Sequence, residues 1–152
     1  MNTDRIGTSR VAVGAACAIF DGRGHVLLVR HTYGRLNWEL PGGGSVSGES
    51  PDETAQRELR EETGLELAVD RLTGVYYEDD HESEPMLHFV FRCPWVPGLV
   101  PEASSPEIAE VGFSPIDDLP TPISDFTERR VSDAWSGRPA AAVRIDRRAW
   151  RA

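Results

Sequence analysis

A run of three glycines, Gly42 to Gly44, precedes a well-capped acidic helix, and this arrangement limits the fold more than any other feature. Glycine lets a backbone approach another group closely. Ser50 suits the helix N-cap and Pro51 the first helical position, while Gly64 stands where a C-terminal cap belongs. The sequence therefore predicts a helix over residues 51–63 that begins shortly after a glycine loop.

The acidic residues of this helix share one face. Glu58, Glu61 and Glu62 are spaced i, i+3 and i+4, so they are neighbours on the helix surface and their like charges repel. Leu59 and Ala55 point the other way, towards a core. Eight carboxylates lie between Glu49 and Asp70, and so much negative charge is costly unless cations neutralise it.

A hard divalent cation is the best explanation of this acidic face. Magnesium and manganese prefer oxygen ligands, and magnesium is commonly held by few carboxylates, several waters and substrate phosphates. Neither histidine nor cysteine occurs in the helix, which disfavours zinc. The glycine loop offers backbone carbonyls to the same ion. The simpler alternative is a solvated, charged helix face.

The rest of the chain reads as strands with one further helix. Strands are predicted over residues 11–20, 25–30, 38–40, 65–77, 86–93, 108–113 and 140–145, and the second helix over residues 123–135. The first two strands read as a hairpin. This order favours an α/β fold with a mixed sheet and helices on its faces. We expect residues 1–9 to be a polar N-terminal arm and residues 10–152 to form a single domain.

Charge and hydropathy exclude several classes of partner. The formal net charge is −9, so a polyanionic nucleic acid or an anionic membrane surface would be repelled on average. No apolar run approaches the roughly 20 residues of a membrane helix. The polar start of the chain lacks the apolar stretch of a secretory signal, and we expect a cytoplasmic protein.

The segment from Gly43 to Leu65 resembles the Nudix box. Gly43 is followed by five residues and Glu49, and seven residues later the chain reads Arg57-Glu58-Leu59-Arg60-Glu61-Glu62-Thr63-Gly64-Leu65. This window of 23 residues matches at all nine specified positions, and Trp38-Glu39-Leu40-Pro41 before it also looks like the family's approach to the box. The resemblance to MutT-like Nudix hydrolases implies an α/β/α sandwich around a mixed sheet.

The resemblance also implies roles for box residues. In similar proteins Glu58 and Glu62 would bind the metal, Mg²⁺ or Mn²⁺, and the carbonyl of Gly43 would be a further ligand. Glu61 would be another metal ligand or the catalytic base. Arg57 would orient a glutamate through an ion pair.

Residues outside the box are placed less firmly by the resemblance. Many members use a further carboxylate, for which Glu107 is the candidate and Glu110 the rival, so Glu61, Glu107 and Glu110 all remain open as the base. Arg30, Arg35 and Tyr76 are the candidate substrate contacts, the arginines for phosphates or a base and the tyrosine for stacking.

The implied reaction is hydrolysis of a phosphoanhydride bond in a nucleoside diphosphate linked to another group. We favour a nucleoside triphosphate, oxidised forms included, cleaved to monophosphate and pyrophosphate. ADP-ribose or a nucleotide sugar, the end of an RNA, and nucleotide sensing without turnover are the alternatives. The complete acid set argues against a sensor, and the lack of a Lys/Arg-rich stripe argues against RNA. Similar proteins are often homodimers.

Overall fold

The computed structural model describes Gly7 and residues 10–152, so the predicted arm lies, apart from Gly7, outside the described residues. The described part contains ten strands and two helices. In chain order they are β1 (Ala12–Ala18), β2 (His25–His31), β3 (Trp38–Glu39), β4 (Gly42–Gly44), α1 (Pro51–Thr63), β5 (Arg71–Glu78), β6 (Met86–Arg92), β7 (Ile108–Pro115), β8 (Ile123–Ser124), α2 (Asp125–Ser136), β9 (Ala142–Ile145) and β10 (Trp150–Arg151). No helix among the described residues is long and apolar enough to cross a membrane.

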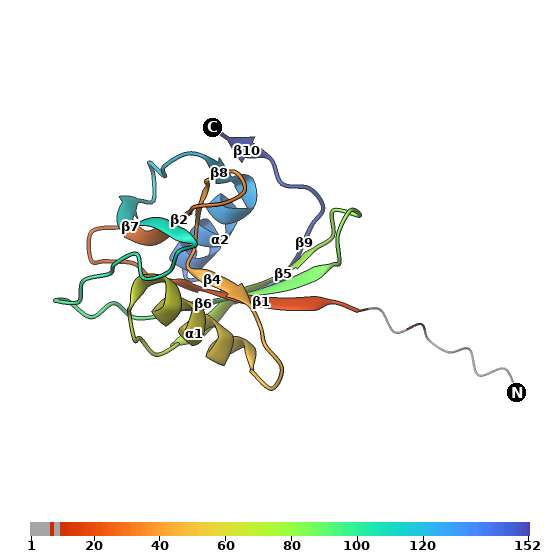
Figure 1. The fold of residues 1–152 in the computed structure, drawn as a ribbon, viewed down its shortest axis with the longest axis horizontal. Helices are drawn as coiled ribbons and strands as arrows, with labels where there is room; N and C mark the ends of the chain where they lie inside the picture. The colour runs from red at the N-terminus through yellow and green to blue at the C-terminus, as the bar shows by residue number, and fades with distance from the viewer. Residues whose placement is uncertain (1–6, 8–9) are drawn as a thin grey trace, which may run out of the picture.

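The strands form two mixed sheets, which confirms the α/β class. One sheet has the order β4-β1-β6-β5-β9 and the other β10-β8-β3-β2-β7. In the first sheet β1 pairs antiparallel with β4 and parallel with β6. Figure 1 shows α1 and α2 on opposite sides of this sheet, as in an α/β/α sandwich.

Strand β1 is buried on both faces because it separates two apolar clusters. Ala16 and Ala18 belong to the cluster that includes Phe126 of α2. Ala15 and Cys17 belong to the cluster that includes Leu59 of α1. The alternation of side chains along a strand explains this division, and a strand covered by helices on both faces reads as one continuous apolar run.

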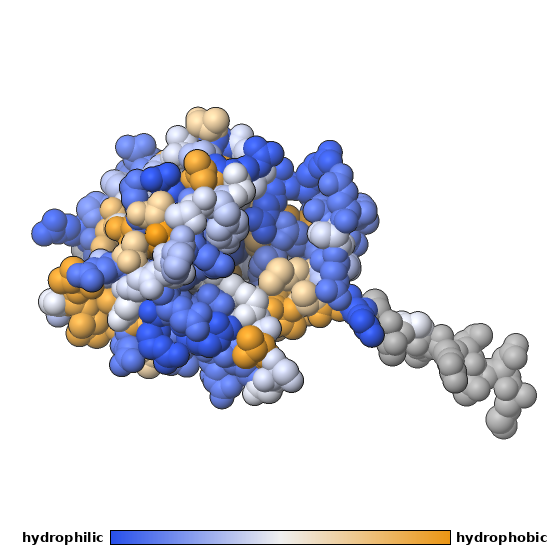
Figure 2. Space-filling view, in the orientation of Figure 1, coloured by the Kyte–Doolittle hydropathy of each residue, from blue (hydrophilic) through white to orange (hydrophobic). Residues whose placement is uncertain are grey.

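The predicted helix 51–63 is confirmed with its caps. The Glu53 side chain accepts a hydrogen bond from the Ser50 N–H at 3.1 Å. Gly64 has φ +73°, a left-handed conformation that favours glycine, and its N–H donates to the Arg60 carbonyl. Buried Ala55 and Leu59 fix α1 to the sheet. Apart from buried Glu62, its acidic residues lie further out, where Figure 2 shows a strongly hydrophilic surface.

Several sequence expectations differ from the structure; the glycine loop forms strand β4, and the last predicted strand begins at Ala142. The strand predicted over 65–77 begins only at Arg71, because Leu65 and Leu67 alternate like a strand but are buried beneath α1 without a ladder partner. The predicted first hairpin is antiparallel only near its turn, at Phe20 and Val26, after which its strands enter different sheets. The second helix begins at Asp125 rather than residue 123.

Candidate active site

The glycine loop forms β4 and lies directly against α1. Gly43 pairs with Ala15 of β1, which places its backbone beside the helix. A Cβ added to Gly43 would lie 2.6 Å from Cδ of Glu58, closer than real Cβ contacts. Glycine is therefore needed here for the loop to approach the carboxylate.

Arg57 organises the acidic face of α1. Its Nε donates to Oε2 of Glu49 at 2.7 Å, and its Nη1 donates to Oε1 of Glu58 at 2.9 Å and to Oε2 of Glu61 at 3.1 Å. Its Nη2 also donates to the Gly44 carbonyl at 2.9 Å. Hydrogen bonds from Arg57 and Thr54 lower the pKa of Glu49 to about 2. The guanidinium thus ties the glycine loop and three glutamates into one preorganised group.

Glu62 is the most buried acid of the helix. Its side chain accepts the Gly42 N–H at 3.0 Å. Burial raises its pKa to about 8, and the negative charges of Glu58 and Glu107 add to this rise. Burial also raises the pKa of Glu58, although its ion pair with Arg57 opposes the change. Two partly desolvated carboxylates that repel one another are an environment that a cation would stabilise.

The donor set fits a magnesium-type ion that a substrate helps to hold. Within residues 10–152 and Gly7, no three His, Cys, Asp or Glu side chains are arranged to hold a metal ion by themselves. Glu58, Glu61 and Glu62 therefore do not form the three-carboxylate cluster expected from their spacing, because Glu61 is turned to Arg57 and is 52% exposed. Two carboxylates and a backbone carbonyl, completed by water and phosphate oxygens, remain typical of magnesium.

The structure separates the two candidate acids outside the box. Glu110 forms an ion pair with Arg30, Nη2 to Oε1 at 2.5 Å, across the β2–β7 pairing. This pairing occupies both Glu110 and the predicted substrate contact Arg30. Glu107 has no such ion pair among the described residues, and its negative charge contributes to raising the pKa of both Glu58 and Glu62.

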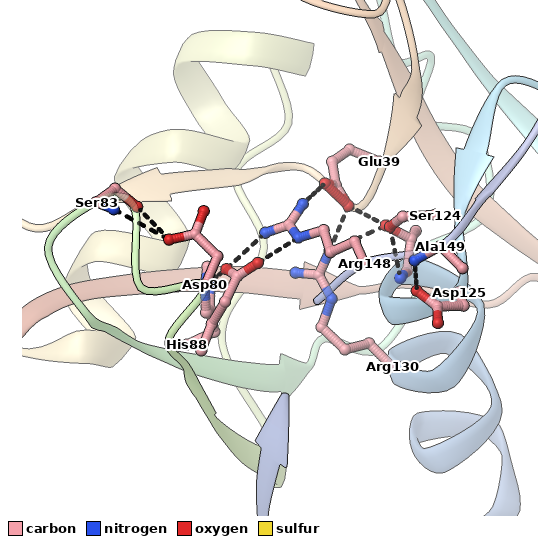
Figure 3. A network of polar contacts seen from close by, with 11 residues as sticks. Glu39, Asp80, Ser83, His88, Ser124, Asp125, Arg130, Arg148 and Ala149 are labelled. Atoms are coloured by element: carbon pink, nitrogen blue, oxygen red, sulfur yellow. Dashed lines mark hydrogen bonds and ion pairs between the residues drawn. The ribbon is translucent and has the colours of Figure 1, made fainter. Parts of the chain in front are cut away.

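A cavity of about 130 Å³ lies beside the glycine loop. Its wall includes the loop itself, the aromatic residues His31 and Tyr33, and the polar residues Glu39, His88, Arg130 and Arg148. Figure 3 shows Arg130 and Arg148 directed towards the carboxylate of Glu39. Sequence reasoning missed these polar residues as a group. The one available signal was an arginine at residue 130, on the otherwise apolar face of the second helix.

Two predicted substrate contacts lie elsewhere. Tyr76 is fully buried in the core, and its hydroxyl donates to Asp133 at 2.7 Å. It therefore cannot stack on a base, and that prediction is wrong. Arg35 lies over the Trp150 ring at 4.7 Å and lines a separate hollow beside the 78–84 loop. Neither it nor Arg30 is among the residues that line the cavity at the glycine loop.

Comparisons with known proteins identify the family of this chain and several of its relatives. A family model described as the NUDIX domain matches residues 9–135. A MutT-like protein of Streptomyces ambofaciens is 32% identical over 126 residues, which is 83% of this chain and 78% of the relative. An ADP-ribose pyrophosphatase of Mycobacterium tuberculosis is 53% identical over 58 residues, only 36% of this chain and 28% of that protein.

Among solved structures, the chain resembles a MutT NUDIX hydrolase from Burkholderia pseudomallei. The TM-score is 0.71 at 27% identity, with coverage of 82% of this chain and 98% of the other. The similarity therefore extends over a whole domain of the same topology.

Proposed function

Since the chain belongs to the NUDIX family and is a Nudix pyrophosphohydrolase, we propose that it cleaves a nucleoside triphosphate to a monophosphate and pyrophosphate, with magnesium or manganese. We also propose that residues 10–152 form the single domain responsible. Enzymes of this family generally depend on a divalent metal and act on small nucleotides. The observation that carries the proposal is the group of Glu49, Glu58 and Glu61 held by Arg57 beside buried Glu62.

The roles that we propose for the box residues follow from their contacts. Glu58 and Glu62 hold the cation, with the Gly43 carbonyl as a further ligand. A bound divalent cation would offset the charge of the diphosphate and lower the pKa of a water molecule. Arg57 positions Glu58 and Glu61, so that their carboxylates need no reorganisation when the substrate binds.

Glu107 is our candidate for the base that accepts a proton from the attacking water. Its negative charge contributes to raising the pKa of Glu62, whereas Glu110 is engaged by Arg30. Glu61 is hydrogen-bonded to Arg57 and half-exposed, which suits a second contact to metal or water better than the main base.

The substrate remains a choice between two classes. A putative 8-oxo-dGTP diphosphatase of Bacillus subtilis, 38% identical over 76 residues that are 50% of this chain and 50% of that protein, supports a nucleoside triphosphate. The local 53% identity to an ADP-ribose pyrophosphatase is the specific observation that favours ADP-ribose instead. That similarity covers little of either protein, so the triphosphate is our first proposal.

Replacing Glu62 tests the proposal, with Glu66 as the matched control. The Glu62→Gln variant removes a carboxylate that would hold the cation, and we expect kcat on the best substrate to fall by about 100-fold or more. Glu66 is exposed just beyond α1, so Glu66→Gln should behave like the wild type.

The assay follows phosphate or pyrophosphate release from nucleoside triphosphates, ADP-ribose and nucleotide sugars, with magnesium, manganese or chelator. Wild-type turnover that survives chelation, or a folded Glu62→Gln variant with normal kcat, would contradict the assigned roles. Cleavage of ADP-ribose alone would select the second substrate class.

A further inference from the structure

The C-terminal segment contributes part of the cavity wall. Strand β9 pairs with β5 in the first sheet, and β10 pairs with β8 in the second. Residues 146–149 therefore cross from one sheet to the other, as Figure 1 shows. This crossing carries Arg148 to the cavity, although the family model ends at residue 135. The wall at Arg148 is thus built outside the region that the chain shares with the family model.

Arg148 belongs to a fixed polar cluster, which we define as Glu39, Glu78, Arg130 and Arg148. Arg148 donates to Glu78 through Nε at 2.5 Å and Nη2 at 2.8 Å, and its Nη1 lies 3.7 Å from Oε2 of Glu39. Arg130 donates to the other oxygen of Glu39. Both guanidinium groups lie over the Phe126 ring, at 4.1 and 4.7 Å. Figure 3 shows the two arginines converging on Glu39.

The charges of this cluster favour a neutral ligand. Its two arginines and two glutamates give a formal charge of zero, and burial lowers the pKa of the neighbouring His88, which disfavours its protonated form. An anionic ligand group would have to displace one of the built-in carboxylates, whereas a neutral polar group would not. Arg130 is also part of the cavity wall. Its Nε, by contrast, is buried inside the wall, out of reach of a ligand, and has no partner among the described residues.

Another part of the cavity wall is aromatic. Tyr33 is 54% exposed and stacks on His31, with ring centroids 4.7 Å apart and planes inclined by 13°. Both rings line the cavity. The cavity volume of about 130 Å³ is close to that of a protein cavity of about 150 Å³ that accommodates one benzene ring. A flat ring is therefore the ligand shape that this wall suits.

We propose that the cluster recognises the nucleobase of the substrate, and that Arg148 is a specificity-determining residue supplied by the C-terminal segment. The base lies against Tyr33 and presents an N–H to Glu39 and an acceptor to Arg130. Arg148 lies beside Glu39, with Nη1 3.7 Å from Oε2, and closes the wall. This inference rests on the proposed function, because it assigns the part of the same substrate that lies beyond the phosphates.

The test compares Arg148→Met with Arg147→Met. Arg147 is the adjacent arginine; it is 81% exposed, and its ion pair among the described residues is a surface contact to Glu82. We measure kcat/KM for four deoxynucleoside triphosphates and for base-free ribose 5-triphosphate. In Arg148→Met, kcat/KM for the preferred nucleotide should fall about tenfold or more, which is consistent with the loss of one good base contact. The preference of this variant among the four bases should largely disappear, and its kcat/KM for the base-free compound should change little. Arg147→Met should match the wild type.

Several outcomes would overturn the proposal. Equal losses on the base-free compound would assign Arg148 to the sugar or phosphates, and an unchanged base preference would exclude it from recognition. If Arg148→Met does not fold, Tyr33→Ser takes its place, since this exposed ring is removable without opening the core. Tyr33→Ser should reduce kcat/KM for the nucleotides and leave kcat/KM for the base-free compound unchanged. Any other pattern contradicts the assignment.

A separate binding measurement distinguishes failure of this inference from failure of the proposed function. Calorimetric titration with nucleoside monophosphates in chelator reports base recognition without catalysis. A preference among bases that Arg148→Met abolishes supports the inference even if no triphosphate is hydrolysed. Hydrolysis of triphosphates without any base preference in the wild type supports the proposed function and refutes the inference.

Discussion

Replacing Gly43 by alanine is a direct test of how the glycine loop serves the acidic helix. The new Cβ would lie 2.6 Å from Cδ and Oε1 of Glu58. That carboxylate is the end of a flexible side chain, so it would move by about 0.8 Å, from 2.6 Å to the 3.4 Å of ordinary van der Waals contact. A misplacement of about 1 Å near the reacting groups costs up to about 100-fold in rate. We therefore expect kcat to fall roughly 10- to 100-fold and the magnesium requirement to increase.

The adjacent glycine provides the control for this prediction. A Cβ on Gly44 would meet no atom of the described residues within 4 Å, and Gly44 is exposed. Gly44→Ala should therefore keep the wild-type kcat and magnesium dependence. Both variants should unfold within about 1 kcal/mol of the wild type, because neither glycine has a positive φ. If Gly43→Ala matched Gly44→Ala in a magnesium titration of steady-state kinetics, the proposed role of Glu58 at the loop would be refuted.

Two further predictions concern acids outside the helix. Glu107→Gln should lower kcat by about 100-fold, the usual contribution of a positioned base. Glu110→Gln should lose the ion pair with Arg30 and keep its kcat. If steady-state kinetics instead showed the larger loss of kcat in Glu110→Gln, the roles of the two acids would be exchanged. For Glu78, burial raises the pKa, but hydrogen bonds from His88 and Arg148 outweigh it and lower the pKa from 4.5 to about 2. Its stabilisation is therefore complete above pH 4.5 and is lost as the pH falls towards 2, amounting to about 2 kcal/mol by pH 3. Urea unfolding at pH 5.5 and pH 3 should show this loss in the wild type and not in Glu78→Gln, and equal losses in both proteins would contradict it.

Local sequence was sufficient where neighbouring residues decide the structure. Ser50, Glu53 and Gly64 predicted both ends of α1, because helix caps are satisfied within a few residues of the chain. The spacing of the acids did not predict that Glu62 is buried along with Leu59, because that burial depends on how α1 packs against the glycine loop. The alternation of apolar residues predicted a strand at Leu65 and Leu67, but these side chains are buried in a segment that pairs with no strand of the described chain.

By itself, then, the sequence determined the Nudix box, its helix and the α/β class, since these follow from short-range spacing and a long motif. Only the tertiary structure decided the surroundings of that helix. It directed Tyr76 into the core, paired Glu110 with Arg30 and brought Arg148 beside Glu39, a residue more than a hundred positions away. The physical reason is that hydrogen bonds and burial depend on which strands pair. Sequence spacing does not encode contacts between elements so far apart in the chain.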